Sequence, residues 1–136
     1  MKRRKAREYA LQMLFQLDFT ERAYVDKALE EFWSGKKEQS DIKEFAVDLV
    51  KGTLNNLDKI DAMIETVTDN WLLKRMAAVD RNILRFAAYE ILFRNDIPSA
   101  VTINEALEIA KKYSSTEAAA FLNGVLDRLA KEAGKV

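Results

Sequence analysis

Residues 77–93 read AAVDRNILRFAAYEILF and decide the fold of the chain. Apolar side chains would cover most of the circumference of a helix formed by this stretch, which predicts a helix that is buried on nearly all sides. The next segment, NDIPS at 95–99, contains the single proline of the chain, Pro98. Proline disfavours helix at the residue before it, and Asn and Asp suit turns. We therefore expect a central, buried helix followed by a clear break.

Outside this stretch, apolar residues recur at helical rather than alternating spacing almost everywhere. Three helices are expected over about 4–17, 25–33 and 41–56. Three more are expected to begin at 58, at 102 and at 114. Trp71 and Leu72 follow the helix that begins at 58, and the helix that begins at 114 carries the last apolar stripe. No strand is expected, and no linker divides the chain. The sequence predicts an all-α fold, a compact bundle of six or seven helices in a single domain over residues 1–136.

Local signals predict where these helices begin and end. Gly35, after Ser34, can adopt the left-handed conformation that closes a helix. Three pairs have the spacing of a capping box and predict helix starts: Asp41 with Glu44, Thr102 with Glu105, and Ser114 with Glu117. Gly124 lies inside the last expected helix, where glycine costs about 1 kcal/mol relative to alanine. We expect another backbone to pack closely against it.

The amino-acid composition excludes most kinds of catalytic site. The chain has no Cys and no His, so disulfides, thiolate zinc sites, cysteine nucleophiles and histidine-based triads are excluded. Four scattered glycines cannot form a phosphate-binding loop. Carboxylate pairs such as Glu105 with Glu108, or Asp80 with Glu90, lack the remaining parts of a catalytic or metal site. We predict a protein that is not an enzyme and has no cofactor and no metal.

Charge is distributed unevenly along the chain. The net charge is zero, yet five of the first seven residues are Lys or Arg, and the other 129 residues carry a net charge of −5. This basic arm, at about residues 1–7, could bind nucleic acid by releasing counterions from phosphates, or it could be a solvated terminus. Polar residues after it interrupt any signal-peptide core, and no membrane span is evident, so a cytoplasmic location is expected.

Aromatic residues accompany the arm. Tyr9 and Phe15 follow it in the first expected helix, and Phe121 lies in the last. Unpaired RNA bases stack on such rings, although an aromatic residue at helical spacing usually belongs to the core. The pattern leaves both interpretations open.

Two blocks of sequence resemble the NusB family. The first is VDRNILRFAAYEIL at 79–92 with DIP at 96–98; the second is TINEALEIAKKY at 102–113 with FLNGVLD at 121–127. With RRKARE at 3–8, the similarity extends over nearly the whole chain. The resemblance implies about seven helices in two packed sub-bundles. It also implies an antitermination factor that binds the boxA element of ribosomal RNA leaders with the ribosomal protein NusE and joins a complex on RNA polymerase.

The resemblance also assigns roles to individual residues. The RNA-binding candidates are the basic arm, for phosphates, and two aromatic residues: Lys2, Arg3, Arg4, Lys5, Arg7, Phe15 and Phe121. The candidates for the NusE interface are Asp80 and three basic residues near it: Lys74, Arg75, Asp80 and Arg81. Three positions depart from the family pattern, Ser114 for a common glycine, Ala120 for a basic residue and Ser99 for an aromatic one, so RNA affinity without NusE is expected to be low.

Two alternatives remain open at this point. A NusB-like domain also begins certain ribosomal RNA cytosine methyltransferases, so the chain could be an accessory RNA-binding domain that acts with a separate methyltransferase. Some family members form dimers, so the chain could also be a self-associating module whose homodimer covers the basic arm.

Overall fold

The computed structural model describes residues 2–69 and 73–135, in which seven α-helices and two short 3₁₀-helices occur and no strand. The elements are α1 (Lys2–Leu17), η1 (Arg22–Tyr24), α2 (Val25–Trp33), α3 (Ser40–Asn55), α4 (Leu57–Val67), η2 (Leu73–Arg75), α5 (Ala78–Phe93), α6 (Ser99–Tyr113) and α7 (Thr116–Glu132). The all-α fold is thereby confirmed. Trp71 and Leu72, expected after the fourth helix, lie outside the described residues.

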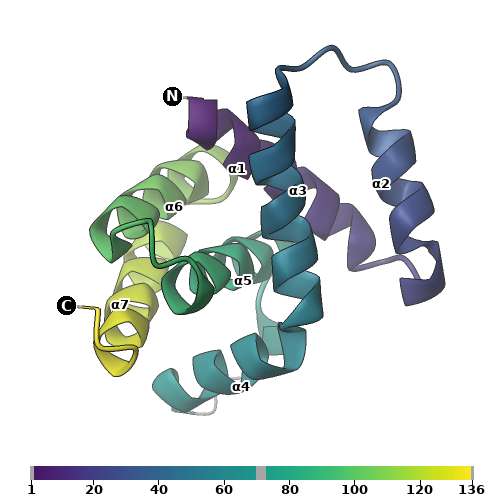
Figure 1. Cartoon of the computed structure of the whole chain (residues 1–136). Coiled ribbons are helices and arrows are strands. Elements are labelled where there is room, and N and C mark those ends of the chain that lie inside the picture. Colours follow the sequence, from purple (N-terminus) through teal and green to yellow (C-terminus); the bar gives the residue numbers. More distant parts are fainter. Residues whose placement is uncertain (1, 70–72, 136) are drawn as a thin grey trace.

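The helices form two packed groups that meet at α5 (Figure 1). In the first group, α1 packs against α2 and α3; in the second, α5, α6 and α7 pack against one another and α4 packs on α5 and α7. Helix α5 also contacts α1 and α3, and so joins the two groups. No helix in the described ranges is both long and apolar enough to span a membrane.

Helix α5 is the centre of the core, as its sequence predicts. Nine of its residues are buried, and seven of them have no exposed surface: the acid Glu90 and six apolar residues, Ile83, Leu84, Phe86, Ala87, Ala88 and Ile91, are at 0%. Burial of aliphatic and aromatic side chains of this size stabilises a domain by roughly 1.5–3 kcal/mol each. A buried acid, Glu90, also lies on this helix, and its partners come from α1 and α6.

Several expected helix ends are wrong by a few residues. Helix α6 begins at Ser99 and not at Thr102, because the residue before it, Pro98, has an extended backbone and α6 continues directly from it. Thr102 is therefore buried inside the helix. Asp41 does not cap α3, which begins at Ser40; its carboxylate instead accepts from the adjacent Ile42 N–H. The cap of α7 is Ser115, whose hydroxyl accepts from Ala118 N–H at 3.0 Å.

Two glycines differ from what the sequence suggests. No atom lies within 4 Å of a Cβ placed on Gly124, so the close backbone contact expected there is absent. The close approach occurs instead at Gly52 on α3, where a Cβ would lie 2.1 Å from Cζ of Tyr89 on α5. Gly52 thus allows α3 and the Tyr89 ring to pack together. Gly35, at φ 79°, closes α2 in the expected left-handed conformation.

Candidate nucleic-acid interface

The basic arm forms the first two turns of α1, so its cations point in fixed and different directions. Lys2, Arg3 and Lys5 are exposed, and Arg4 is half-buried. Arg7 lies on the same face as Ala6 and Ala10, which pack in the core, and is only 2% exposed. Its assignment as a phosphate contact is therefore wrong, because its guanidinium is shielded from any ligand.

Arg7 is held in a buried ionic cluster. Its Nε and Nη2 donate to both oxygens of Glu90 at 2.8 and 2.7 Å, and Thr102 Oγ1 donates to Glu90 at 2.8 Å. Glu90 has no exposed surface. A bidentate, charge-assisted pair in such surroundings fixes orientation, and loss of one partner leaves an unpaired buried charge. The cluster fastens α1 to α5 and α6 and so fixes the direction of the exposed cations of the arm.

Three more cations of the arm have carboxylate partners. Arg4 forms two hydrogen bonds to Glu105 on α6, Lys2 lies 3.3 Å from Asp41, and Lys5 lies 2.7 Å from Glu38. Hydrogen bonds from Lys5, from the Tyr9 hydroxyl and from a backbone N–H lower the pKa of Glu38 to about 2. Lys2 and Asp41 are both exposed, and exposed ion pairs are worth little, so a phosphate can replace Asp41 as the partner of Lys2. Lys5 is exposed but the Glu38 side chain is only 7% exposed, so replacing that partner costs more.

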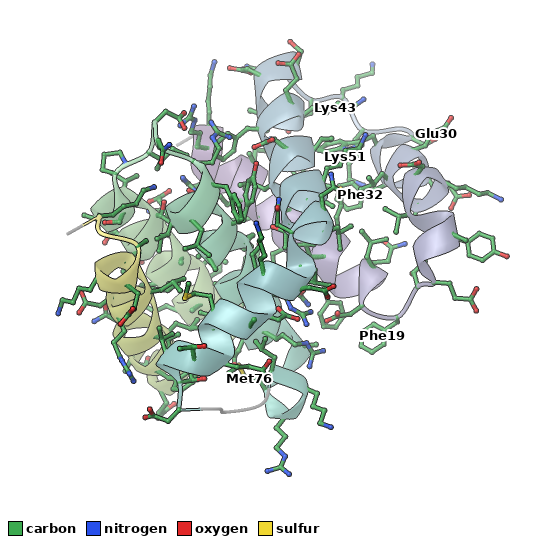
Figure 2. The ribbon with its side chains drawn as sticks, turned by 60° about the horizontal axis from the view of Figure 1, so that its bottom comes forward. Phe19, Glu30, Phe32, Lys43, Lys51 and Met76 are labelled. Carbon is green, nitrogen blue, oxygen red and sulfur yellow. The ribbon has the colours of Figure 1, made fainter. Side chains whose placement is uncertain are left out.

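The second half of α1 exposes aromatic rings. Phe15 and Phe19 are 41% and 74% exposed, and their ring centroids lie 5.6 Å apart. Figure 2 shows Phe19 projecting from the turn after α1. Phe15 is therefore available for base stacking, as the sequence predicts. Phe19 is a candidate that the sequence analysis missed, although it lies one helical turn after Phe15.

The end of α6 adds two further groups beside α1. Glu8 accepts hydrogen bonds from Lys112 Nζ at 3.0 Å and from the Tyr113 hydroxyl at 2.8 Å. Both residues are exposed. Both belong to the segment 102–113 that resembles the family, but the resemblance assigns them no role. Contact with Glu8 brings them next to the first half of α1, where a cation and a ring suit a single strand of RNA.

Phe121 is exposed, at 42%, but belongs to a separate surface. It lines a shallow pocket on α7 with Asp69, Val125 and Arg128. In the described part of the chain, no ring contact joins Phe121 to the aromatic residues of α1. The structure therefore does not bring the two predicted aromatic RNA neighbours together.

The four residues predicted for the NusE interface also differ in their exposure and contacts. Lys74 and Arg75 are exposed on η2. Arg81 is bound within the chain: Nη2 donates to Asp18 at 2.9 Å, and Nη1 donates to the carbonyls of Leu73 and Met76. Arg81 thus holds η2 in place rather than presenting a free cation. Asp80 is half-buried, and its Oδ1 is buried without a hydrogen-bond partner.

Comparison with known proteins identifies the family. The NusB family model matches residues 4–131. The chain belongs to the NusB family. The transcription antitermination protein NusB of Thermodesulfovibrio yellowstonii is 52% identical, with 97% of this chain and 93% of that protein covered. NusB of Desulfitobacterium hafniense is 48% identical, with coverage of 99% and 92%.

Solved NusB structures have the same fold. T. maritima NusB superposes with a TM-score of 0.85 at 42% identity, covering 96% of this chain and 91% of that one. A second match, the crystal structure of antitermination factors NusB and NusE in complex with dsRNA, has a TM-score of 0.86 at 27% identity and covers 96% and 97%. The relatives in the NusB family are named transcription antitermination proteins and not for an enzyme activity, which confirms the prediction of a non-enzymatic factor.

Proposed function

We propose that the chain is a single RNA-binding domain, residues 1–136, that binds the boxA element of ribosomal RNA leaders together with NusE. The observation that carries the proposal is the exposed face of α1. Lys5 and Phe15 are exposed along it, Lys112 and Tyr113 lie beside it at Glu8, and Lys2 and Arg3 are exposed at the start of the helix. Cations for phosphates and rings for bases are what a protein needs to hold single-stranded RNA.

The partner proposal rests on η2 and the start of α5. Lys74 and Arg75 are exposed there, and Asp80 beside them is half-buried. These groups suit a polar protein partner, and the NusB structure solved with NusE and dsRNA supports NusE as that partner. The resulting pair would join the antitermination complex on RNA polymerase, which places the chain in the bacterial cytoplasm.

A need for NusE follows from the charges on α1. Lys2 and Lys5 already face carboxylates of the same chain, so each phosphate contact must displace an existing partner. The net gain per contact is smaller than for a free cation. The relatives described above are transcription antitermination proteins, which favours this role over that of an accessory domain for a methyltransferase.

Fluorescence anisotropy of labelled boxA RNA tests this proposal. Binding with NusE should be tighter than binding to scrambled RNA and should weaken with salt, since each released counterion contributes to the slope. Failure to prefer boxA in the presence of NusE contradicts the proposal. A Lys74→Glu, Arg75→Glu variant should bind NusE less tightly while its binding to RNA alone is retained.

Exposed rings also support self-association as a second candidate. Phe19 and Tyr24 are 74% and 56% exposed, and Phe15 lies against Phe19. Exposed apolar rings in contact with each other, as Phe15 and Phe19 are, commonly mark a protein contact. A homodimer formed there would cover Phe15. Light scattering with and without boxA RNA should then show dissociation on RNA binding, and Phe19→Ser should give a monomer.

A further inference from the structure

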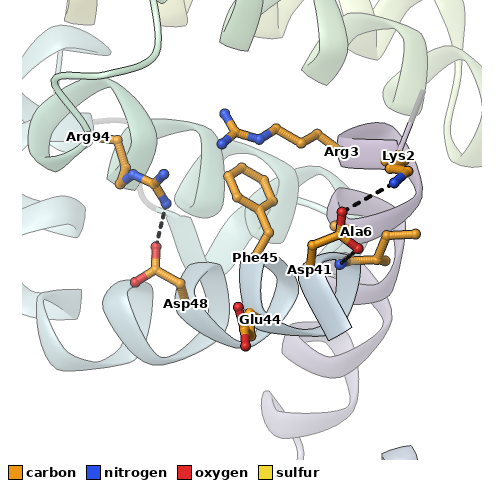
Figure 3. Close-up of a pocket in the computed structure, with 9 residues that line it drawn as sticks. Lys2, Arg3, Ala6, Asp41, Glu44, Phe45, Asp48 and Arg94 are labelled. Atoms are coloured by element: carbon orange, nitrogen blue, oxygen red, sulfur yellow. Dashed lines mark hydrogen bonds and ion pairs between the residues drawn. The ribbon is translucent and has the colours of Figure 1, made fainter. Parts of the chain in front are cut away.

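A pocket of about 460 Å³ opens between the start of α1, the first half of α3 and the end of α5 (Figure 3). Its volume lies in the range of roughly 300–1,000 Å³ that small ligands occupy. Lys2 and Arg3 reach it from the arm, and Glu44, Phe45 and Arg94 line the rest. The last three have no part in the function proposed above.

Arg3 forms a ready stacking surface in this pocket. Its guanidinium carbon lies 4.5 Å from the centroid of the Phe45 ring, and the guanidinium carbon of Arg94 lies 5.2 Å from the same centroid. Arg94 is bound to Asp48 at 2.7 Å and to Asp96 at 2.9 Å. Among the described residues, Arg3 has no hydrogen bond and no ion pair. Its charge acts on Asp96, whose pKa is lowered by the hydrogen bond from Arg94 and also by Arg3. The Arg3 guanidinium lies over the Phe45 ring, and RNA bases stack on guanidinium planes.

The acidic residues of the pocket indicate which part of a nucleotide can enter. Asp41 is bound to Lys2 at 3.3 Å and Asp48 to Arg94, whereas Glu44 is exposed and has no hydrogen-bond or ion-pair partner in the described part of the chain. Carboxylates repel a phosphate but accept hydrogen bonds from the N–H groups of a base. A base therefore fits the interior of the pocket, and the ammonium of Lys2 can exchange Asp41 for the phosphate.

We propose that this pocket binds the guanine base of a nucleotide that adjoins the RNA element held by α1. The inference rests on the proposed RNA-binding function and adds a base-specific subsite to it. Arg3 stacks on the base. The carboxylate of Glu44 accepts from N1–H and the 2-amino group of guanine, two adjacent donors that match two carboxylate oxygens. Adenine has a single donor on this edge, so the site discriminates against it.

The test measures the anisotropy of boxA RNA extended by one nucleotide at either the 5′ or the 3′ end, with NusE present. A guanosine at one of the two ends should tighten binding about tenfold, as expected for one stacked and hydrogen-bonded base. Adenosine and inosine, which lacks the 2-amino group, should gain less. Glu44→Gln should remove the preference for guanosine, and Glu30→Gln, an exposed acid on α2, is the matched control.

Arg3→Lys separates stacking from charge. Because Arg3 also belongs to the RNA-binding cations, the affinity of each protein for the extended RNA is divided by its own affinity for the unextended RNA. Lysine keeps the positive charge but lacks the planar group, so the gain from guanosine in this ratio should be lost. The inference is overturned if guanosine gives no gain at either end, if adenosine gives the same gain, or if Glu44→Gln behaves like Glu30→Gln.

Free guanosine 5′-monophosphate tests the pocket independently of boxA. At millimolar concentration it should shift the NMR signals of Arg3 and Phe45, and adenosine 5′-monophosphate should shift them less. Unchanged signals contradict the pocket. Shifts with the nucleotide but no binding of any boxA RNA would contradict the proposed function and leave the pocket supported.

Discussion

Replacing Arg7 with alanine should destabilise the fold strongly and show that this residue is a buried anchor and not an RNA contact. The guanidinium is 2% exposed and donates to both oxygens of Glu90, which is 0% exposed. Breaking a buried pair by removing one partner costs about 3–5 kcal/mol, because the remaining charge is left unpaired. For a domain of this size, at about 4 °C per kcal/mol, the melting temperature should fall by on the order of 10–20 °C.

Thermal and urea unfolding followed by circular dichroism measure this loss. Arg4→Ala is the matched control, because Arg4 forms a similar pair with Glu105 but its side chain is 29% exposed. It should cost about 1 kcal/mol. Arg7→Met combined with Glu90→Leu removes both charges and should be less destabilising than Arg7→Ala alone. An Arg7→Ala protein that unfolds like the wild type and yet loses RNA binding would refute the reasoning.

Three further predictions concern packing and pH. Gly52→Ala should cost about 1–3 kcal/mol, because its Cβ would overlap the Tyr89 ring, whereas Gly124→Ala should stabilise by up to about 1 kcal/mol; thermal unfolding of both variants is the check. Thr102→Val removes a hydroxyl that donates to a buried carboxylate and should cost about 1–2 kcal/mol in urea unfolding. The pKa of Glu38 is lowered from 4.5 to about 2, so its contribution to stability is present above pH 4.5 and is lost as the pH falls to 2. Melting temperatures of wild type and Glu38→Gln should therefore differ at neutral pH and converge near pH 2.

The core could be predicted because the spacing of apolar residues along the sequence indicates which sides of a helix are buried. The all-round apolar character of α5 is visible along the chain, and the buried helix is where that pattern places it. Burial of Arg7 is harder to predict from the sequence than burial of α5. Arg7 is three residues before Ala10 on the inward stripe of α1, and Glu90 is the matching acid inside the most apolar helix. Two opposite charges on buried faces predict a pair only when the helices that carry them are known to meet.

Caps and close contacts depend on partners distant in the sequence, and the sequence analysis missed them for that reason. Thr102 and Glu105 have capping-box spacing, but the hydroxyl donates to Glu90 and the carboxylate binds Arg4, both far away in the chain. Gly52 is required only because the Tyr89 ring lies against it. The base pocket likewise arises where α1, α3 and the end of α5 meet, and no local motif marks it.

The salt dependence of the affinity for boxA RNA, measured with NusE present, tests most directly whether the exposed face of α1 binds RNA. Wild-type protein is compared with a Lys2→Gln, Arg3→Gln, Lys5→Gln variant at a temperature well below the melting temperatures of both proteins. The wild type should lose affinity steeply with salt, and the variant should bind more weakly with a slope that is smaller by about one per lost phosphate contact. Equal affinity and equal slope in the two proteins would contradict the account.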